Sequence, residues 1–197
     1  KVIDEYPKDQ VVEDEKTPSG RIHLGSLRGF VLHQIIFQAL KDAGAKAKFL
    51  LGSDDTDELD SIPTYWKDKI DEKYLGMPLY SVPSPSGNFK SYAEEVTEEV
   101  YSHFDELGLT PELYNTSEKY KDGTFNDSIK IALVNAEKIN EINRQVSGAD
   151  KKAGSLPFKV ICPNCGKINT TVSTEFDGKT VAFECKGFKT FKGCREK

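Results

Sequence analysis

Residues 17–26, with the sequence TPSGRIHLGS, hold the first side chains whose types and spacing suggest chemistry. Gly20 and Gly25 have no side chain, so the backbone there can approach a ligand closely. His23 could donate a hydrogen bond to a phosphate oxygen, and Ser26 could cap a helix or contact the ligand. A helix beginning here would direct its dipole and free N–H groups at an anion. The segment predicts a phosphate-binding turn, and a tight turn with an ordinary cap is the alternative.

A second group comprises all four cysteines, which lie within the last 36 residues: Cys162, Cys165, Cys185 and Cys194. Their spacing, C-x2-C-x19-C-x8-C, predicts a tetrahedral Zn²⁺ site with four thiolate ligands. Four thiolates leave no open position, so the metal would be structural. The last interval is wider than the expected two residues, which places Cys194 in question. Free or disulfide-bonded cysteines are the alternative.

The turn at 17–26 must be positioned by the elements around it. Residues 9–15 predict a strand with a buried Val11–Val12 pair, and residues 24–43 a helix whose wide apolar face packs deeply. Gly44 is placed to end that helix, and residues 46–51 predict the next buried strand. This order is that of a βαβ unit, which implies a parallel sheet with ligand sites at the carboxyl ends of its strands.

Further along the chain, apolar periodicity predicts helices over 92–107 and 126–145 and a strand over 109–115. Ser91 and Glu94 match a capping box.

The C-terminal segment has its own pattern. Residues that alternate in polarity on both sides of Asp177 and Gly178 predict a β-hairpin. With the four cysteines, this hairpin predicts a zinc ribbon, which is too small to fold without metal. Residues 147–156 are typical of a linker. We therefore expect a Rossmann-like α/β domain over 1–150 and a zinc-ribbon-like subdomain over 151–197.

Charge is distributed unevenly along the 197 residues. The net charge is −5, which disfavours general nucleic-acid binding. Residues 151–197, however, hold 10 Lys and Arg against 4 Asp and Glu, whereas residues 1–150 hold 17 against 28. An acidic body with a basic end can still receive a polyanion at one place. No apolar run reaches the roughly 18 residues that cross a membrane, so a cytoplasmic protein is expected.

The turn, with the motif His23-Leu24-Gly25-Ser26, resembles the His-Ile-Gly-His signature of class I aminoacyl-tRNA synthetases. The preceding Thr-Pro-Ser-Gly is similar to that of the class I lysyl-tRNA synthetases. Segments 53–57, 74–79, 82–83, 91–94 and 161–166 also resemble that family in order and spacing, so the resemblance covers nearly the whole chain.

The resemblance implies a ligase that activates lysine with ATP and then esterifies tRNA(Lys), with Mg²⁺ and Zn²⁺ as cofactors. It implies that the side chains of His23 and Ser26 act on ATP, that Thr17 lies near the amino acid, and that the basic zinc ribbon contacts the tRNA acceptor end. The residues expected around ATP are Pro18, Ser19, Gly20, His23, Gly25 and Ser26.

Two parts of the chain depart from the family pattern. Glu15 stands where the family usually has Gly beside the bound lysine, so its carboxylate would either attract the lysine ammonium or fill the pocket. Ser84, Asn88, Phe89 and Glu95 stand where several relatives carry an Asp, Cys and His metal cluster. Since neither Phe nor a Ser hydroxyl is a normal zinc ligand, we expect no metal at these positions.

No Lys-Met-Ser-Lys-Ser loop and no anticodon-binding domain are recognisable in the chain. We therefore expect an N-terminal portion of the enzyme that is inactive alone. The alternatives are a truncated paralogue that does not charge tRNA, and a zinc-ribbon nucleic-acid-binding module on an unrelated α/β scaffold. Asp54, Asp55 and Asp57 would contact substrate or tRNA, would hold Mg²⁺, or would serve as helix caps and solubilising charges.

Overall fold

The computed structural model describes residues 5, 9–148, 154–188 and 191–197 of the chain. These residues form two compact units. The first contains the chain up to Asp57 together with Leu79–Glu118, and the second contains Glu58–Pro78 and Lys119–Lys197. Residues 119–148 thus group with the cysteine-rich segment, whereas the sequence suggested a boundary at residue 150. The ranges 1–150 and 151–197 stay a prediction for the domains.

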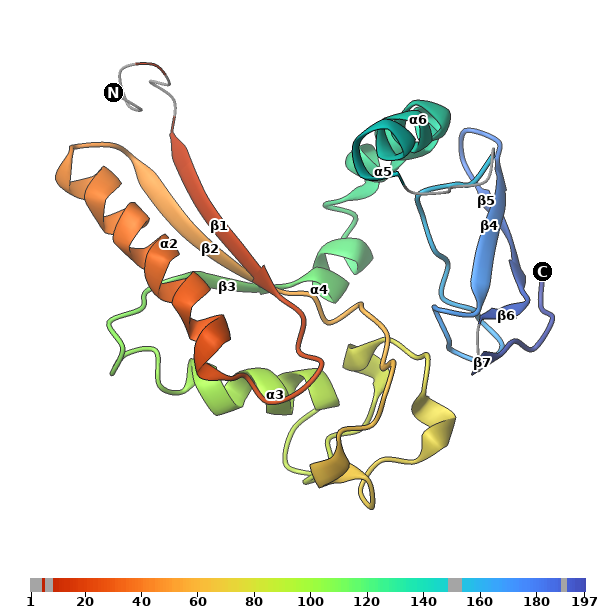
Figure 1. The fold of residues 1–197 in the computed structure, drawn as a ribbon, viewed down its shortest axis with the longest axis horizontal. Helices are drawn as coiled ribbons and strands as arrows, with labels where there is room; N and C mark the ends of the chain where they lie inside the picture. Colours follow the sequence, from red (N-terminus) through yellow and green to blue (C-terminus); the bar gives the residue numbers. More distant parts are fainter. Residues whose placement is uncertain (1–4, 6–8, 149–153, 189–190) are drawn as a thin grey trace. The chain divides into compact units, whose positions relative to one another are not determined.

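The first unit is built on a parallel sheet of three strands, in the order β1-β2-β3. β1 spans Gln10–Lys16, β2 Ala47–Ser53 and β3 Glu112–Asn115, and helix α2 (Leu24–Asp42) connects β1 to β2 (Figure 1). The α/β class and the predicted βαβ unit are therefore confirmed. Because all three strands run the same way, their carboxyl ends meet at one edge of the sheet.

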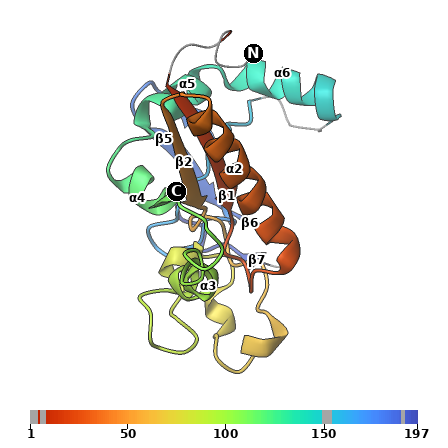
Figure 2. The same ribbon diagram turned by 90° about the vertical axis from the view of Figure 1, so that its left-hand side faces the viewer.

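Helix α2 lies along β1 and β2 (Figure 2). Its last residue is Asp42, and Gly44 stops it as predicted, because the left-handed φ of 82° there is accessible to glycine and turns the chain out of the helix. Phe30 is its one fully buried residue, and Leu32, Ile35 and Ile36 are 50–59% exposed. The expected deep packing was wrong, since the apolar stripe is wider than the surface that the described strands offer it.

Strand β1 shows a similar difference. Val12 is buried and Val11 is 58% exposed, so the predicted buried pair was wrong. Successive side chains of a strand point to opposite faces, and α2 contacts only one of them. Asp14, on the same face as Val12, lies against His33 of α2 with 3.1 Å between its carboxylate and the ring nitrogen.

The core of the first unit joins residues from distant parts of the chain. Phe30, Leu51, Phe104 and Leu109 are buried together. Helix α3 spans Tyr92–Tyr101, shorter than predicted, and turns carry the chain on to Gly108. Within the predicted capping box, the Ser91 hydroxyl accepts the Glu94 N–H, while the Glu94 carboxylate accepts the N–H of Lys90.

In the second unit, the predicted helix over 126–145 is two helices: α5 (Asn126–Val134) and α6 (Ala136–Ser147). They meet at Asn135, whose side-chain amide donates to the Ile131 carbonyl at 2.8 Å. The Asn135 N–H donates to the same carbonyl at 3.1 Å, and the Asn135 carbonyl accepts the Ile139 N–H at 3.0 Å, so backbone hydrogen bonds continue across the turn between the two helices. Short helix α4 (Thr116–Lys121) precedes α5 along the chain.

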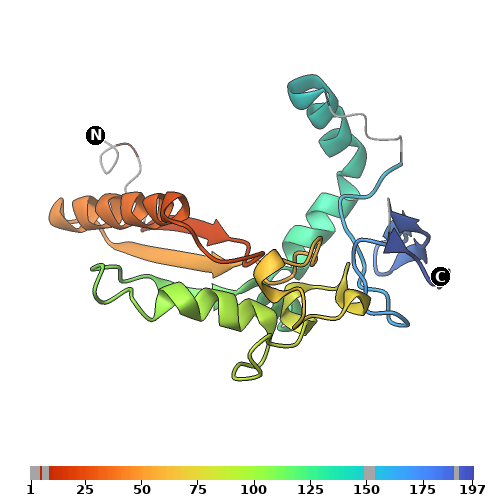
Figure 3. The same ribbon diagram turned by 60° about the horizontal axis from the view of Figure 1, so that its bottom comes forward.

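The rest of the second unit consists of irregular turns and two hairpins (Figure 3). Strands β4 (Thr171–Phe176) and β5 (Val181–Cys185) form the antiparallel hairpin predicted around Asp177 and Gly178. Strands β6 (Gly187–Phe188) and β7 (Phe191–Lys192) form a second, smaller one. Short 3₁₀ turns lie at Thr64–Trp66 and Glu72–Tyr74 here, and at Leu79–Ser81 in the first unit. Among the described residues, no helix has the length and apolar character to span a membrane.

Candidate functional site

Two loops and the short helix α4 meet at the carboxyl edge of the parallel sheet. Each begins where a strand ends, after Lys16, Ser53 and Asn115. The Asp54 N–H donates to the Lys16 carbonyl at 3.1 Å, which extends the pairing of β1 and β2 by one residue. This edge therefore brings the predicted phosphate-binding turn and the acidic loop together, as expected for a ligand site in a parallel sheet.

The turn after β1 is anchored to α3. Tyr92 is completely buried, and its hydroxyl donates a 2.7 Å hydrogen bond to the carbonyl oxygen of Ser19. Pro18 is also fully buried, whereas Ser19 itself is exposed. At the exposed surface, Arg21 donates to Glu99 of α3 at 3.1 Å. The backbone of residues 17–21 is thus held in place by contacts that leave one side open.

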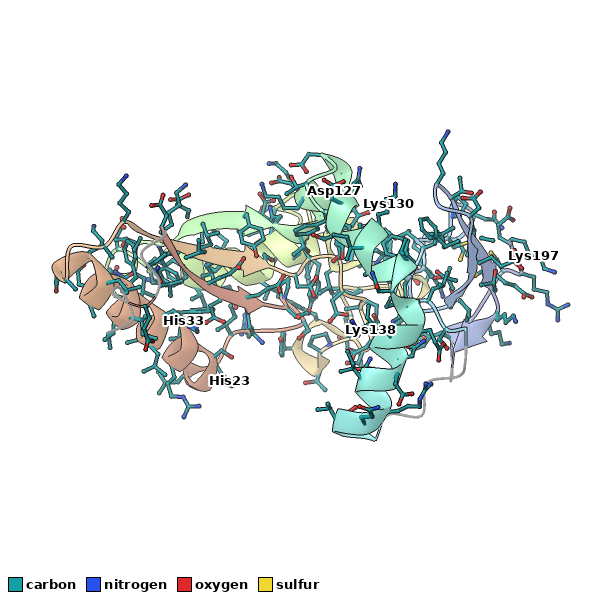
Figure 4. All side chains as sticks on the ribbon, turned by 90° about the horizontal axis from the view of Figure 1, so that it is seen from above. His23, His33, Asp127, Lys130, Lys138 and Lys197 are labelled. Atoms are coloured by element: carbon teal, nitrogen blue, oxygen red, sulfur yellow. The ribbon has the colours of Figure 1, made fainter. Side chains whose placement is uncertain are left out.

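His23 lies at the start of α2 as its N-cap residue (Figure 4). Its backbone is extended (φ −97°, ψ 163°) and its carbonyl accepts the Ser26 N–H at 2.9 Å. No side chain caps the helix, and no acidic residue occupies its first turn. A Cβ atom at Gly25 would lie 3.0 Å from ring atoms of His23, so glycine gives the imidazole room above the first turn. The uncapped N-terminus of this 19-residue helix suits an anion.

Two carboxylates of the acidic loop, those of Asp54 and Asp55, accept hydrogen bonds from neighbouring residues of the chain. Asp55 is buried, and its carboxylate accepts the Ser117 N–H at 2.8 Å, the Ser117 hydroxyl at 2.6 Å and the Thr116 hydroxyl at 3.1 Å. It therefore caps the start of α4, which agrees with the helix-cap alternative. Asp54 accepts from Thr56 at 2.8 Å and from Thr116 at 3.2 Å. The side chain of Asp57 is exposed.

Glu15 points away from α2, on the same face of β1 as Glu13. Partial burial raises its pKa above the ordinary value, and the nearby charges of Asp54 and Glu13 add to the effect. On this face Tyr114 lies across Gly52, where a Cβ would come within 2.6 Å of the phenol, and donates to Glu13 at 2.7 Å. The face beside the edge is therefore crowded with carboxylates, and the role of Glu15 towards lysine stays a prediction.

Two residues of this site were given no individual role from the sequence, although they lie in the segments 53–57 and 91–94 that resemble the family. The hydroxyl contact of Tyr92 is invisible in a local pattern. Ser53 is 1% exposed, and its hydroxyl has no hydrogen-bond partner among the described residues. Its position directly before the acidic loop was the signal that could have identified it, because strand ends at this edge face the ligand.

The four cysteines form one cluster in the second unit, with all four sulfur atoms within 4.8 Å of one another. The Cys162 and Cys194 sulfurs are 3.4 Å apart, and those of Cys165 and Cys185 3.8 Å. Tetrahedral Zn²⁺ with Zn–S bonds of about 2.3 Å requires sulfurs about 3.8 Å apart, so the cluster fits such an ion. Burial raises the pKa of Cys165 to about 12, whereas the Glu196 N–H lowers that of exposed Cys194 to about 7.

The two halves of the cluster are built alike. In the first, Cys162 donates its N–H to the Lys167 carbonyl at 2.9 Å, and the Cys162 carbonyl accepts the Gly166 N–H at 2.8 Å. In the second, Cys185 donates to Glu196 at 2.8 Å and accepts from Arg195 at 2.9 Å. We call these hydrogen-bonded turns the first and second knuckle. Cys194 belongs to the cluster as fully as the other three cysteines.

The interval of eight residues in the second knuckle now has an explanation. Strands β6 and β7 lie between Cys185 and Cys194, so a small hairpin leaves the knuckle and returns to it. At Gly187 the chain turns out of the knuckle into β6. Its φ of 99° is left-handed, and a Cβ there would lie 2.7 Å from the Phe191 carbonyl oxygen. The Cys194 N–H points at the Cys185 sulfur at 3.3 Å, as is common in thiolate metal sites.

The segment that holds Ser84, Asn88 and Phe89 forms a hydrogen-bonded loop against Glu95. The buried Glu95 carboxylate accepts the Ser84 hydroxyl and, at 3.1 Å, the Ser86 N–H. The Ser84 hydroxyl in turn accepts the N–H groups of Gly87 and Phe89. Asn88 is exposed. The expected lack of a metal at this loop stays a prediction.

Comparison with known proteins identifies the family that these features resemble. The family model described as tRNA synthetases class I (K) matches residues 1–196. Lysine–tRNA ligases of Methanosarcina barkeri and Archaeoglobus fulgidus are each 36% identical over 86% of the chain, and that of Methanocaldococcus jannaschii is 33% identical over 98%. The matches cover 32%, 34% and 38% of these relatives, so the chain spans about a third of their length.

Proposed function

The chain belongs to the class I (K) family of tRNA synthetases, and we propose that the complete protein is a lysine–tRNA ligase. In its first step, a carboxylate oxygen of lysine attacks the α-phosphorus of ATP, and the bond to pyrophosphate breaks. In its second step, a ribose hydroxyl at the end of tRNA(Lys) attacks the lysyl carbonyl, and AMP leaves. We assign the first step to the carboxyl edge of the parallel sheet.

The uncapped N-terminus of α2 beside the exposed His23 carries this proposal. Helix N–H groups and the positive end of the helix dipole attract the phosphates. His23 donates to a phosphate oxygen as charge moves onto the departing pyrophosphate, and preorganised donors of this kind supply much of the catalysis. Ser26 contributes a hydroxyl one turn further along.

The remaining residues of the turn act through the backbone. The nucleotide would lie on a surface formed by Pro18, Ser19 and Gly20. Tyr92 holds this surface in place through its hydrogen bond to the Ser19 carbonyl. Gly25 keeps the space above the first turn clear. Thr17 follows the last residue of β1 and is assigned to the amino acid. Mg²⁺ bound with ATP would neutralise part of the phosphate charge.

The cysteine cluster is proposed to hold Zn²⁺ through Cys162, Cys165, Cys185 and Cys194. Its sulfur spacing supports this assignment. The ion joins two knuckles from distant parts of the sequence, so it contributes to folding and not to the reaction. We further propose that the basic second unit contacts the acceptor end of tRNA(Lys), and that the protein works in the cytoplasm.

The decisive test is ATP–pyrophosphate exchange by the complete gene product. We expect exchange that depends on lysine and is not supported by other amino acids. Metal analysis of the same preparation should find Zn²⁺. ATP binding without lysine-dependent exchange would instead indicate a paralogue that does not charge tRNA, and exchange with a different amino acid would reassign the substrate and point to Glu15.

A further inference from the structure

The two knuckles differ at one equivalent position. The residue after the last cysteine has a left-handed backbone in both, with φ 71° at Gly166 and φ 68° at Arg195. Both residues donate their N–H to the carbonyl of the first cysteine of their knuckle. Glycine takes this conformation freely, whereas a residue with a Cβ is strained in it. Arg195 is the only residue other than glycine with a positive φ among the described residues.

Stability alone does not account for an arginine at this position. The metal site needs only the N–H of Arg195, and glycine provides the same N–H in the first knuckle. The side chain of Arg195 is exposed and makes no ion pair within the described part of the chain. Strained residues that persist where a simpler one would serve are concentrated at functional sites. The guanidinium therefore has a use outside the knuckle.

The surroundings of Arg195 indicate an anionic partner. Residues 186–197 contain five Lys and Arg and one Glu. Lys192 and Lys197 are exposed like Arg195, and both lie within three residues of Cys194 in the sequence (Figure 4 labels Lys197). Lys186 is instead paired with Glu184 at 3.0 Å. Arginine binds phosphate through two parallel N–H bonds, which makes it the preferred residue for nucleic-acid backbones.

We propose that the second knuckle binds the backbone of a single-stranded RNA end, with Arg195 as the phosphate contact and Lys192 and Lys197 as supporting charges. This inference rests on the proposed function, in which that RNA is the 3′ end of tRNA(Lys). A knuckle tied to the proposed Zn²⁺ by the sulfurs of Cys185 and Cys194 would be rigid, so the guanidinium would be presented with little loss of entropy on binding.

The substitution Arg195→Gly separates binding from folding. It removes the charge and relieves the left-handed strain, so the variant should retain its zinc and melt at or above the wild-type temperature. Its affinity for a tRNA(Lys) transcript should fall about three- to tenfold, and the slope of log affinity against log salt should decrease by about 0.7, the value for one single-strand phosphate contact. Arg195→Lys, which keeps the charge, should recover part of the affinity.

Two controls locate the contact. Lys179→Ala removes one positive charge at the exposed turn between β4 and β5, away from the knuckle along the hairpin, and should leave tRNA affinity unchanged. A tRNA(Lys) transcript without its single-stranded 3′ end should bind wild type and Arg195→Gly equally. Unchanged affinity of Arg195→Gly for intact tRNA, or an equal loss on both transcripts, would overturn the proposal.

Lysine-dependent ATP–pyrophosphate exchange, measured in the same preparations without tRNA, tests the proposed function separately. If exchange is present and Arg195→Gly binds tRNA like wild type, only the inference about the second knuckle fails. If exchange is absent, the proposed function fails, and the affinities for the two transcripts still decide whether the second knuckle binds a single-stranded RNA end.

Discussion

Two tyrosines of helix α3 have opposite surroundings. The Tyr92 hydroxyl donates to the Ser19 carbonyl in the turn after β1. The Tyr101 hydroxyl is buried without a hydrogen-bond partner among the described residues, and burial beside Asp14 raises its pKa to about 12. One hydroxyl therefore supports the candidate site, whereas the other carries a desolvation cost with no compensating bond.

Replacing each tyrosine by phenylalanine tests this difference. Tyr92→Phe should lower the free energy of unfolding by about 0.5–1.5 kcal/mol and raise the KM for ATP, because the Ser19 backbone loses its support. Tyr101→Phe should be neutral or stabilising, since it removes an unpaired buried polar group. Urea unfolding and exchange kinetics of the complete protein measure both effects. An unchanged KM for ATP in Tyr92→Phe would mean that the turn does not need this contact.

His23 carries the second prediction about single residues. In the complete protein, His23→Ala should slow lysine-dependent exchange by about 10²–10³, the loss typical of one preorganised donor to a developing negative charge. Because His23 is exposed, its removal should leave the unfolding free energy nearly unchanged. His103→Ala is the matched control, as His103 is also exposed but lies in the turns that follow α3. Equal rates for the two variants would contradict the role of His23.

The helices and strands of the two units differ in how much apolar core holds them together. The first unit gathers Phe30, Leu51, Phe104 and Leu109 between α2, the sheet and the turns after α3. The part of the second unit around the cysteine cluster consists of the small hairpins and the turns that carry the cysteines. Cys162 and Cys185 are themselves among its most buried residues. The proposed Zn²⁺ would therefore stabilise small elements that have little apolar core of their own.

Removal of Zn²⁺ by a chelator is expected to affect the two units differently. Amide protection against hydrogen exchange should be lost in β4, β5 and the two knuckles, because their cross-link is gone. Protection in β1, β2 and α2 should remain, since none of the cysteines contributes to the core around Leu51. Mass spectrometry of exchanged peptides measures both regions in one sample. Retained protection around Cys185 after complete metal removal would show that the ribbon folds without zinc.

The chain as a whole corresponds to about a third of its relatives. Its described edge offers donors for the nucleotide, but no Lys-Met-Ser-Lys-Ser segment is present in the 197 residues. Stabilisation of the departing pyrophosphate, which the resemblance assigns partly to that segment, is therefore expected to be incomplete.

A purified 197-residue protein should accordingly show no lysine-dependent ATP–pyrophosphate exchange above background, whereas the complete gene product should show it. Circular dichroism and zinc content of the shorter protein serve as controls for folding. Exchange by the shorter protein at the rate of the complete one would refute the expectation that the chain is inactive alone.

Local patterns were sufficient for the elements that depend on neighbours in the sequence. The βαβ unit, the Gly44 stop, the start of α3 at Ser91 and the hairpin at Asp177 and Gly178 were all predicted, because periodicity, caps and tight turns are encoded within a few residues. The clustering of the four cysteine sulfurs was likewise indicated by their spacing, whereas the metal itself stays a prediction. The turn at Asn135 was missed because the apolar stripe and the backbone hydrogen bonds both continue through it.

Contacts between distant residues were decided only in three dimensions. From the sequence, Asp55 was known only as an acidic residue that follows a strand. Its hydrogen bond with Ser117 in the folded chain shows that it is a buried helix cap. Arg195 was likewise only one of several basic residues in the sequence. In the second knuckle its backbone is left-handed, as the backbone of Gly166 is in the first. Residues 58–78 similarly joined the second unit across the sequence. Periodicity reports which face of an element is apolar, but burial and strain depend on which other element reaches that face.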